Sequence, residues 1–235
     1  MEKLGIELNW KLFQERSIYE LFPDKLAQFE VEFKPGDEFI PVIEAGTDSW
    51  KGATAALCKL NSDLKGNIIV CTAVSAFETV SEARQAELLP RTYLIAMAHG
   101  VERIFWYNFR SAEWAPGERE AHFGIVRKDL EPKLSFLALK TLTGLCPSGS
   151  TTPSIRRAGD VFLSGWTRPD GVKVWALWSS LREHSVRLGV SGTVAEARNH
   201  LGERLPIPDA RCSVSPSVIY FVGPEDISFE APDQE

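Results

Sequence analysis

Polar side chains that could do chemistry stand at the ends of two predicted strands. Glu44 closes the apolar run 39–43, and Asn108 and Arg110 follow the aromatic run 104–107. In barrels and doubly wound sheets, ligands bind at the carboxyl ends of the strands. Glu44, Asn108 and Arg110 therefore stand where a ligand would lie.

Other catalytic chemistries leave no comparable pattern in the sequence. There is no GxSxG elbow, no GxxxxGK[ST] phosphate loop and no GxGxxG, and the four histidines show neither HxH nor HExxH spacing. The four cysteines form no CxxC pair, so we expect free thiols in a reducing compartment. We therefore expect no metal site and no cofactor.

Composition and charge narrow the range of partners. The 235 residues are 44% hydrophobic and 25% charged with a net charge of −6, which is typical of a globular protein. No Lys/Arg-rich stripe is present to bind phosphates, so we expect no nucleic-acid partner. No run of eighteen apolar residues suggests a membrane span, and the first residues do not resemble a signal peptide, so we expect a cytoplasmic chain.

The stretch from Thr79 to Phe109 has the strongest secondary-structure signal. Thr79 and Glu82 have the spacing of a capping box, and apolar residues then follow one helical face up to Gly100. Pro90 interrupts this pattern, which predicts a bend or a restart of the helix. The apolar run 103–109 then predicts a strand that is buried on both faces.

The same alternation of strand and helix covers the first part of the chain. Strands are predicted over 38–46 and 67–72, a helix over 48–65, and a further helix from Asp129 to Gly144 with Pro132 near its start. Buried strands with helices between them indicate a parallel sheet. The predicted fold class is therefore α/β, with residues 1–145 as its first domain.

After Gly144 the hydrophobic period changes from helical to two. Residues 146–157 are rich in turn-forming residues and predict a linker, and 161–167 with 172–178 predict a hairpin. Further short strands are predicted over 185–190, 194–199 and 217–222. We expect a small antiparallel β-sandwich over 158–223 and a loose acidic tail over 224–235. The residues predicted to form one sandwich core are Phe162, Trp175, Leu177, Val186, Leu188 and Tyr220.

The chain from about Asn67 to Gly223 resembles the last third of a clan A glycoside hydrolase. The resemblance rests on VSEARQAELLPRTYLIAMAHGVERIFWYNFR, followed by HFGIVRKDLEPKLSFLALKTL and then by a small β-domain. Enzymes of this clan are (β/α)8-barrel retaining glycosidases, among them β-xylosidase-like and cellulase-like families. The resemblance implies that the first domain is a partial barrel holding the last three β/α units.

The resemblance also implies where the catalytic carboxylates should stand. Retaining glycosidases use an acid/base at the end of strand four and a nucleophile at the end of strand seven, ~5 Å apart. No strand four is recognisable, and the strand-seven nucleophile position falls on Ala73. Ile43-Glu44-Ala45-Gly46 itself resembles a strand-seven ending, so a different register makes Glu44 the nucleophile. Glu78 is a second carboxylate near this position, with a solvated loop residue as the alternative.

Trp106, Tyr107 and Asn108 are the candidate substrate-binding residues. In the family, an aromatic residue at the end of strand eight forms the floor of the sugar subsite, and this position falls on Trp106. A core tryptophan between sheet and helices is the alternative. Glu113 and Trp114 can also reach a sugar from their loop, or be solvated loop residues.

Two functions of different class follow. The first is a carbohydrate-processing enzyme of the retaining glycosidase type, of which this chain is a C-terminal portion or a shortened relative. The second is a sugar-binding or scaffold protein that has lost the carboxylate pair. Because a sheet of three strands leaves an open edge, we also expect copies of the chain to associate.

Overall fold

The structure is a computed structural model of the 235-residue chain. It describes residues 42–44, 68–73, 81–98, 100–106, 108–112, 119–180 and 182–230. Within these ranges, no helix combines the length and the apolar character needed to cross a membrane. The helix predicted over 48–65 lies outside the described residues.

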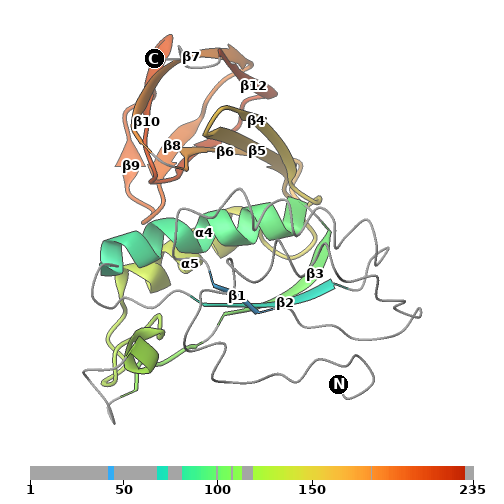
Figure 1. The fold of residues 1–235 in the computed structure, drawn as a ribbon. Coiled ribbons are helices and arrows are strands. Elements are labelled where there is room, and N and C mark those ends of the chain that lie inside the picture. Colours follow the sequence, from blue (N-terminus) through green and yellow to red (C-terminus); the bar gives the residue numbers. More distant parts are fainter. Residues whose placement is uncertain are drawn as a thin grey trace, which may run out of the picture.

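Three parallel strands form the first layer of the fold (Figure 1). β1 (Val42–Glu44), β2 (Ile68–Ala73) and β3 (Val101–Trp106) are neighbours in that order, with β2 in the middle. This confirms the predicted parallel sheet, although β3 covers 101–106 rather than 103–109. The interpretation of this sheet as the end of a barrel stays a prediction.

The helix α4 (Glu82–Ala98) connects β2 to β3. Its N-cap is Ser81 rather than the predicted Thr79, because Ser81 Oγ accepts the backbone N–H of Arg84 at 3.1 Å. The helix end is as predicted. Gly100 has φ 79°, and its N–H donates to a carbonyl of the last helical turn.

Pro90 lies inside α4, which continues through it as a single helix. The predicted restart therefore does not occur. Proline has no N–H, so Pro90 cannot donate to the carbonyl of Ala86 four residues earlier. The helix loses one backbone hydrogen bond there. Pro90 is itself buried, as are Leu88 and Leu89 before it, so packing offsets this cost.

The segment after β3 passes through the short 3₁₀ helix η2 (Arg119–His122) to α5 (Leu134–Leu145). The predicted helix start at Asp129 is wrong. Pro132 forms an antiparallel β-bridge with Val126, and Lys133 is still extended, with φ −82° and ψ 170°. Because this pairing holds the chain extended, the helix cannot begin before Leu134.

Antiparallel strands form two sheets in the second half of the chain. The six-stranded sheet has the order β4-β5-β6-β11-β8-β9, and the three-stranded sheet has the order β10-β7-β12. The hairpin of β5 and β6 confirms the predicted one. The strands are β4 (Ser154–Ala158), β5 (Val161–Thr167), β6 (Lys173–Ser179), β7 (His184–Ser191), β8 (Glu196–Asn199), β9 (Arg204–Leu205), β10 (Arg211–Val214), β11 (Ile219–Val222) and β12 (Asp226–Phe229).

β4 and β12 lie where the sequence predicted a linker and a loose tail. β4 occupies part of the predicted linker 146–157 and pairs with β5 along its whole length. β12 occupies part of the predicted loose tail 224–235, and it pairs with β7 while Ile227 is fully buried. The prediction of a loose tail is therefore wrong for residues 226–229, because one buried side chain in a short strand leaves little pattern to read.

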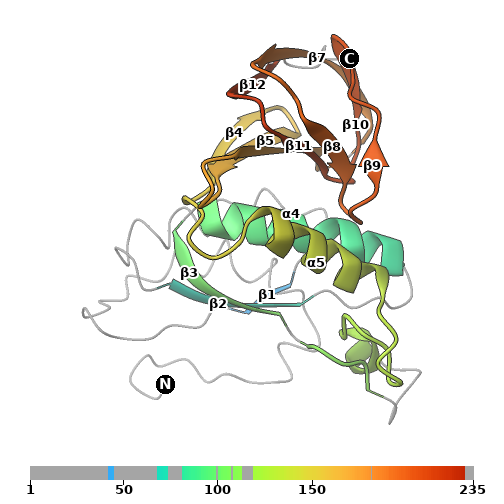
Figure 2. The same cartoon turned by 180° about the vertical axis from the view of Figure 1, so that it is seen from behind.

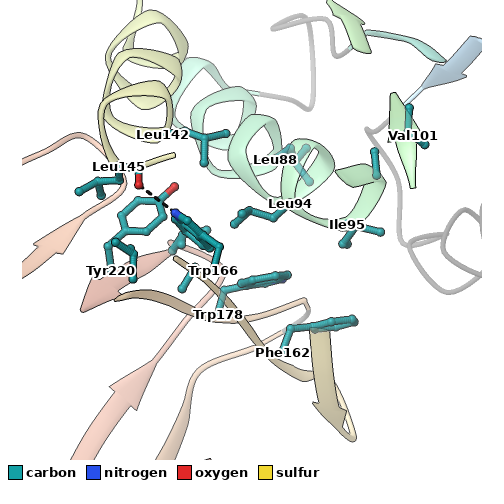
Figure 3. Packing of buried hydrophobic residues seen from close by; sticks show 14 residues of the cluster. Leu88, Leu94, Ile95, Val101, Leu142, Leu145, Phe162, Trp166, Trp178 and Tyr220 are labelled. Atoms are coloured by element: carbon teal, nitrogen blue, oxygen red, sulfur yellow. Dashed lines mark hydrogen bonds between the residues drawn. The ribbon is translucent and has the colours of Figure 1, made fainter. Parts of the chain in front are cut away.

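The helices lie between the parallel sheet and the six-stranded sheet (Figures 1 and 2). A set of buried side chains, which we call the helix–sheet cluster, joins α4, α5 and β3 to one face of the six-stranded sheet (Figure 3). Within it, Trp178 stacks on Phe162 with 5.3 Å between ring centroids and 3° between planes. Its large members are Leu88, Leu94, Ile95, Leu142, Phe162, Trp166, Trp178 and Tyr220.

A second set, the inter-sheet cluster, fills the space between the two antiparallel sheets. Leu163, Leu177, Val186, Phe221 and Ile227 belong to it. The single predicted sandwich core is therefore divided between two clusters. Phe162 and Tyr220 belong to the helix–sheet cluster, because neighbouring residues of a strand alternate between the two faces of its sheet.

Candidate functional site

The carboxyl ends of the three parallel strands bring the predicted site positions together. Glu44, the last residue of β1, is the register partner of Ala73, the last residue of β2. Thr72 is in turn the partner of Trp106, the last residue of β3. Since neighbouring strands lie ~4.8 Å apart, these strand ends form one edge. Tyr107 lies outside the described residues, as do Glu78, Glu113 and Trp114.

Trp106 is the last residue of β3, and its side chain packs against α4. Its ring stacks on Tyr93 of α4, with 6.5 Å between centroids and 26° between planes. It also packs against the helix–sheet cluster and against a smaller cluster that contains Leu89 and Ile125. Trp106 is half-buried, and both interpretations of it, a core tryptophan and a sugar-binding floor, stay predictions.

The chain beyond β3 is fixed by hydrogen bonds to the loop that precedes α5. Phe109 O accepts the N–H groups of Ile125 and Val126, both at 3.0 Å, and the N–H of Ser111 donates to Val126 O at 2.9 Å. A side chain at Gly124 would meet the Ser111 nitrogen at 2.0 Å, so this close approach requires glycine. The two backbone segments therefore form one rigid unit beside the strand ends.

Three buried polar side-chain atoms lie in this unit or in the residues just before it. Trp106 Nε1, Asn108 Oδ1 and Ser111 Oγ have no hydrogen-bond partner in the described part of the chain. An unpaired buried polar group typically costs ~1–3 kcal/mol, and such groups call for an explanation where they occur together. Asn108, a predicted substrate-binding residue, is one of the three.

Gln85 holds this unit against the N-terminal turn of α4. Its side chain donates to Phe123 O at 3.3 Å and accepts a hydrogen bond of 2.8 Å from Ser135 Oγ at the start of α5. Lys133 is also buried, and its Nζ donates to His122 O at 3.2 Å. Burial lowers the pKa of Lys133. Gln85 and Lys133 therefore position the loop beside the strand ends.

Arg91 connects the other side of α4 to the antiparallel strands. Its guanidinium is fully buried and donates to Pro216 O at 3.3 Å and to Ser180 O at 3.4 Å. Burial lowers its pKa to about 9. One turn earlier, Glu87 accepts a hydrogen bond from Ser217 Oγ at 3.0 Å. The motif residues Gln85, Glu87 and Arg91, on which the family resemblance rested, thus connect the layers of the fold.

Sequence reasoning missed a cluster of Asp160, Ser179 and His184. The Asp160 carboxylate accepts hydrogen bonds from Ser179 Oγ at 2.9 Å and from His184 Nε2 at 2.8 Å. Because the carboxylate lies between the other two, the histidine is not placed to activate the serine, and no catalytic triad is formed. The cluster instead connects the ends of β6 and β7, which belong to different sheets.

Replacing this carboxylate is expected to weaken the fold in a pH-dependent way. Burial raises the pKa of Asp160, but the hydrogen bonds from His184 and Ser179 outweigh it and hold the pKa below its usual 3.8. A depressed carboxyl pKa stabilises the fold above pH 3.8, and this contribution is lost as the pH falls further. Asp160→Asn should lower the free energy of unfolding at pH 7 by ~1–3 kcal/mol and flatten its acid dependence in urea titrations.

Asp209→Asn is the matched control for this prediction, because Asp209 is exposed. It should change the free energy of unfolding by less than ~0.5 kcal/mol. An equal effect of the two variants would contradict a specific role for the Asp160 carboxylate.

The comparison with solved structures identifies the fold class. The chain is similar to a family 39 glycoside hydrolase from the gut symbiont Bacteroides cellulosilyticus WH2, with a TM-score of 0.57 and 19% identity over 72% of the chain. A weaker similarity is to SrfJ from Salmonella typhimurium, with a TM-score of 0.49 and 10% identity over 79% of this chain. Another is to the catalytic domain of GH30 xylanase C from Talaromyces cellulolyticus, with a TM-score of 0.45 and 9% identity over 74% of this chain.

The chain spans 37%, 40% and 49% of these three proteins, in the same order. No protein-family model matches the sequence, and no curated protein is significantly similar to it. At 19% identity, the similarity to the family 39 structure establishes a shared fold. The fold is therefore related to part of a glycoside hydrolase.

Proposed function

We propose that this chain is part of a carbohydrate-processing protein of the glycoside hydrolase type, with its sugar site at the carboxyl ends of β1, β2 and β3. The observation that carries the proposal is the register of the sheet, which brings Glu44, Ala73 and the end of β3 to one edge. The fold shared with the family 39 enzyme supports it. In this proposal the parallel strands are the last three units of a (β/α)8-barrel, and the antiparallel sheets are its accompanying sandwich.

Glu44 is the proposed carboxylate of the site, and Tyr107 and Asn108 are proposed sugar contacts. A retaining mechanism requires two carboxyl groups ~5 Å apart, one as acid/base and one as nucleophile. Position 73 is the register partner of Glu44 and holds alanine, which can do neither. We therefore expect this chain by itself to bind sugars without hydrolysing them.

A non-catalytic sugar-binding or scaffold protein is the second candidate. Ala73 in register with Glu44 is the observation that favours it. The two candidates make the same prediction for the isolated chain, and they differ in whether a longer form supplies the missing carboxylate. Upstream sequence can add the strand-four acid/base but cannot change Ala73, so hydrolysis by a longer form would require Glu44 as the nucleophile and would favour the first candidate.

Hydrolysis is tested with a panel of nitrophenyl glycosides on the 235-residue chain. The expected result is release of nitrophenol no faster than in buffer, because general acid/base assistance alone is typically worth ~10²- to 10⁴-fold. Turnover that disappears in Glu44→Gln would make Glu44 the nucleophile and contradict the assignment of that position to Ala73. Turnover that survives in Glu44→Gln would require another carboxylate.

The same chain, folded as judged by circular dichroism, is then titrated with oligosaccharides of glucose and of xylose in a calorimeter. Binding of one series is the expected result. The Ala73→Glu variant tests the position of the site, because a second negative charge beside Glu44 should change the affinity. Absence of binding to every sugar would contradict the proposed function.

A further inference from the structure

Phe109 has an exposed aromatic ring just beyond the carboxyl end of β3. Its exposed fraction is 59%, the largest among the exposed large hydrophobic side chains of the described residues. Single exposed apolar residues are common on protein surfaces, so exposure alone does not indicate a role. What distinguishes Phe109 is how its backbone is held and which edge it occupies.

The backbone on both sides of Phe109 is fixed. Its carbonyl accepts two N–H groups from residues 125 and 126, and the next residue, Arg110, forms a parallel β-bridge with Val126. The Arg110 side chain is also tied down, because its Nε donates to Lys128 O at 2.6 Å. A ring on such a rigid backbone loses little conformational entropy when a ligand packs against it.

The position of Phe109 relative to the sheet supports a role at the proposed site. It follows the last residue of β3 by three positions, and β1 and β2 end at the same edge with Glu44 and Ala73. Trp106 is covered by Tyr93 on one side of its ring, whereas Phe109 is open to solvent. Of these two aromatic residues, Phe109 has the greater free surface for a ligand.

We propose that Phe109, and not Trp106, provides the flat apolar surface on which a sugar ring packs. The inference rests on the proposed function and refines its site. A sugar ring presents C–H groups on its faces and hydroxyl groups at its rim, so it suits an aromatic ring with polar groups nearby. Asn108 and Ser111 lie one and two positions from Phe109 in the chain, and their side-chain oxygens lack partners among the described residues.

The test compares Phe109→Ala with Leu130→Ala by calorimetric titration with the glucose and xylose oligosaccharides. Leu130 is a matched control because it is 57% exposed and lies in the same loop region. Phe109→Ala should weaken binding about tenfold or more, since an apolar contact of this size is lost. Leu130→Ala should leave the affinity unchanged, and Phe109→Trp should retain or strengthen it.

The outcomes separate this inference from the proposed function. If the unaltered protein binds a sugar and Phe109→Ala binds it equally well, the assignment of Phe109 is overturned while the proposed function stands. If Phe109→Ala and Leu130→Ala weaken binding equally, the assignment is also overturned. If the unaltered folded protein binds none of the sugars, the proposed function fails and this assignment fails with it.

Discussion

Truncation of the chain after Gly223 is expected to cost about 4 kcal/mol of unfolding free energy or more. The change removes β12, and with it the fully buried Ile227 of the inter-sheet cluster. It also removes Pro224 O, which accepts the Trp175 indole N–H at 3.1 Å, and Asp226, which pairs with Arg156 at 2.9 Å. Urea unfolding followed by tryptophan fluorescence measures the loss.

The matched control is truncation after Glu230, which leaves β12 intact. This shorter deletion should change the free energy of unfolding by less than ~0.5 kcal/mol. The longer deletion also exposes an edge of β7, so we expect it to aggregate more readily than the control. Equal stability of the two truncated proteins would show that β12 does not contribute to the core as its burial indicates.

Trp178→Ala is expected to lower the free energy of unfolding by ~3–5 kcal/mol, the usual cost of removing a large buried aromatic side chain. Trp178 is fully buried on the face of β6 that meets the helices, where it stacks on Phe162. Because the helix–sheet cluster is shared between the layers, the helical signal at 222 nm and the tryptophan signal should shift together in urea.

Ile207→Ala provides the control, since Ile207 is 50% exposed. The free energy of unfolding of this variant should lie within ~0.5 kcal/mol of that of the unaltered protein. Two separate transitions in Trp178→Ala, with the helical one unchanged, would instead indicate that the helices and the antiparallel strands fold independently.

The shared cluster changes how the predicted domains should be understood. The sequence suggests a boundary near residues 146–157, because turn-forming residues gather there. In the structure, α5 ends at Leu145, whose carbonyl accepts the Trp166 indole N–H from β5 at 2.8 Å (Figure 3). Arg91 adds polar contacts from α4 to the loops around Ser180 and Pro216. The antiparallel strands therefore complete the burial of the helices.

Much of the secondary structure was determined by the sequence alone. The parallel strands were predicted because apolar runs of this length suit strands covered on both faces, and the hairpin of β5 and β6 was predicted because its period of two is interrupted by a tight turn. Gly100 was predicted to end α4, because a left-handed backbone conformation favours glycine. In each case a local physical preference agrees with the final fold.

The start of α5 and the formation of β12 were decided by strand pairing that the sequence pattern does not show. α5 begins at Leu134 because Val126 pairs with Pro132 and keeps the preceding residues extended, which no helical pattern reveals. β12 forms because β7 offers it a free edge and the inter-sheet cluster receives Ile227. Both depend on partners that only the folded chain brings close.

For the candidate site, the sequence alone determined which residue types stand at the strand ends, with Glu44, Ala73 and Trp106 among them. Only the tertiary structure decided how they are arranged. The register of the sheet places Glu44 beside Ala73, and packing against Tyr93 turns Trp106 toward the helices while Phe109 remains exposed. The face that a strand residue presents depends on which layer covers it, and a buried strand covered on both sides carries no alternation from which that face could be read.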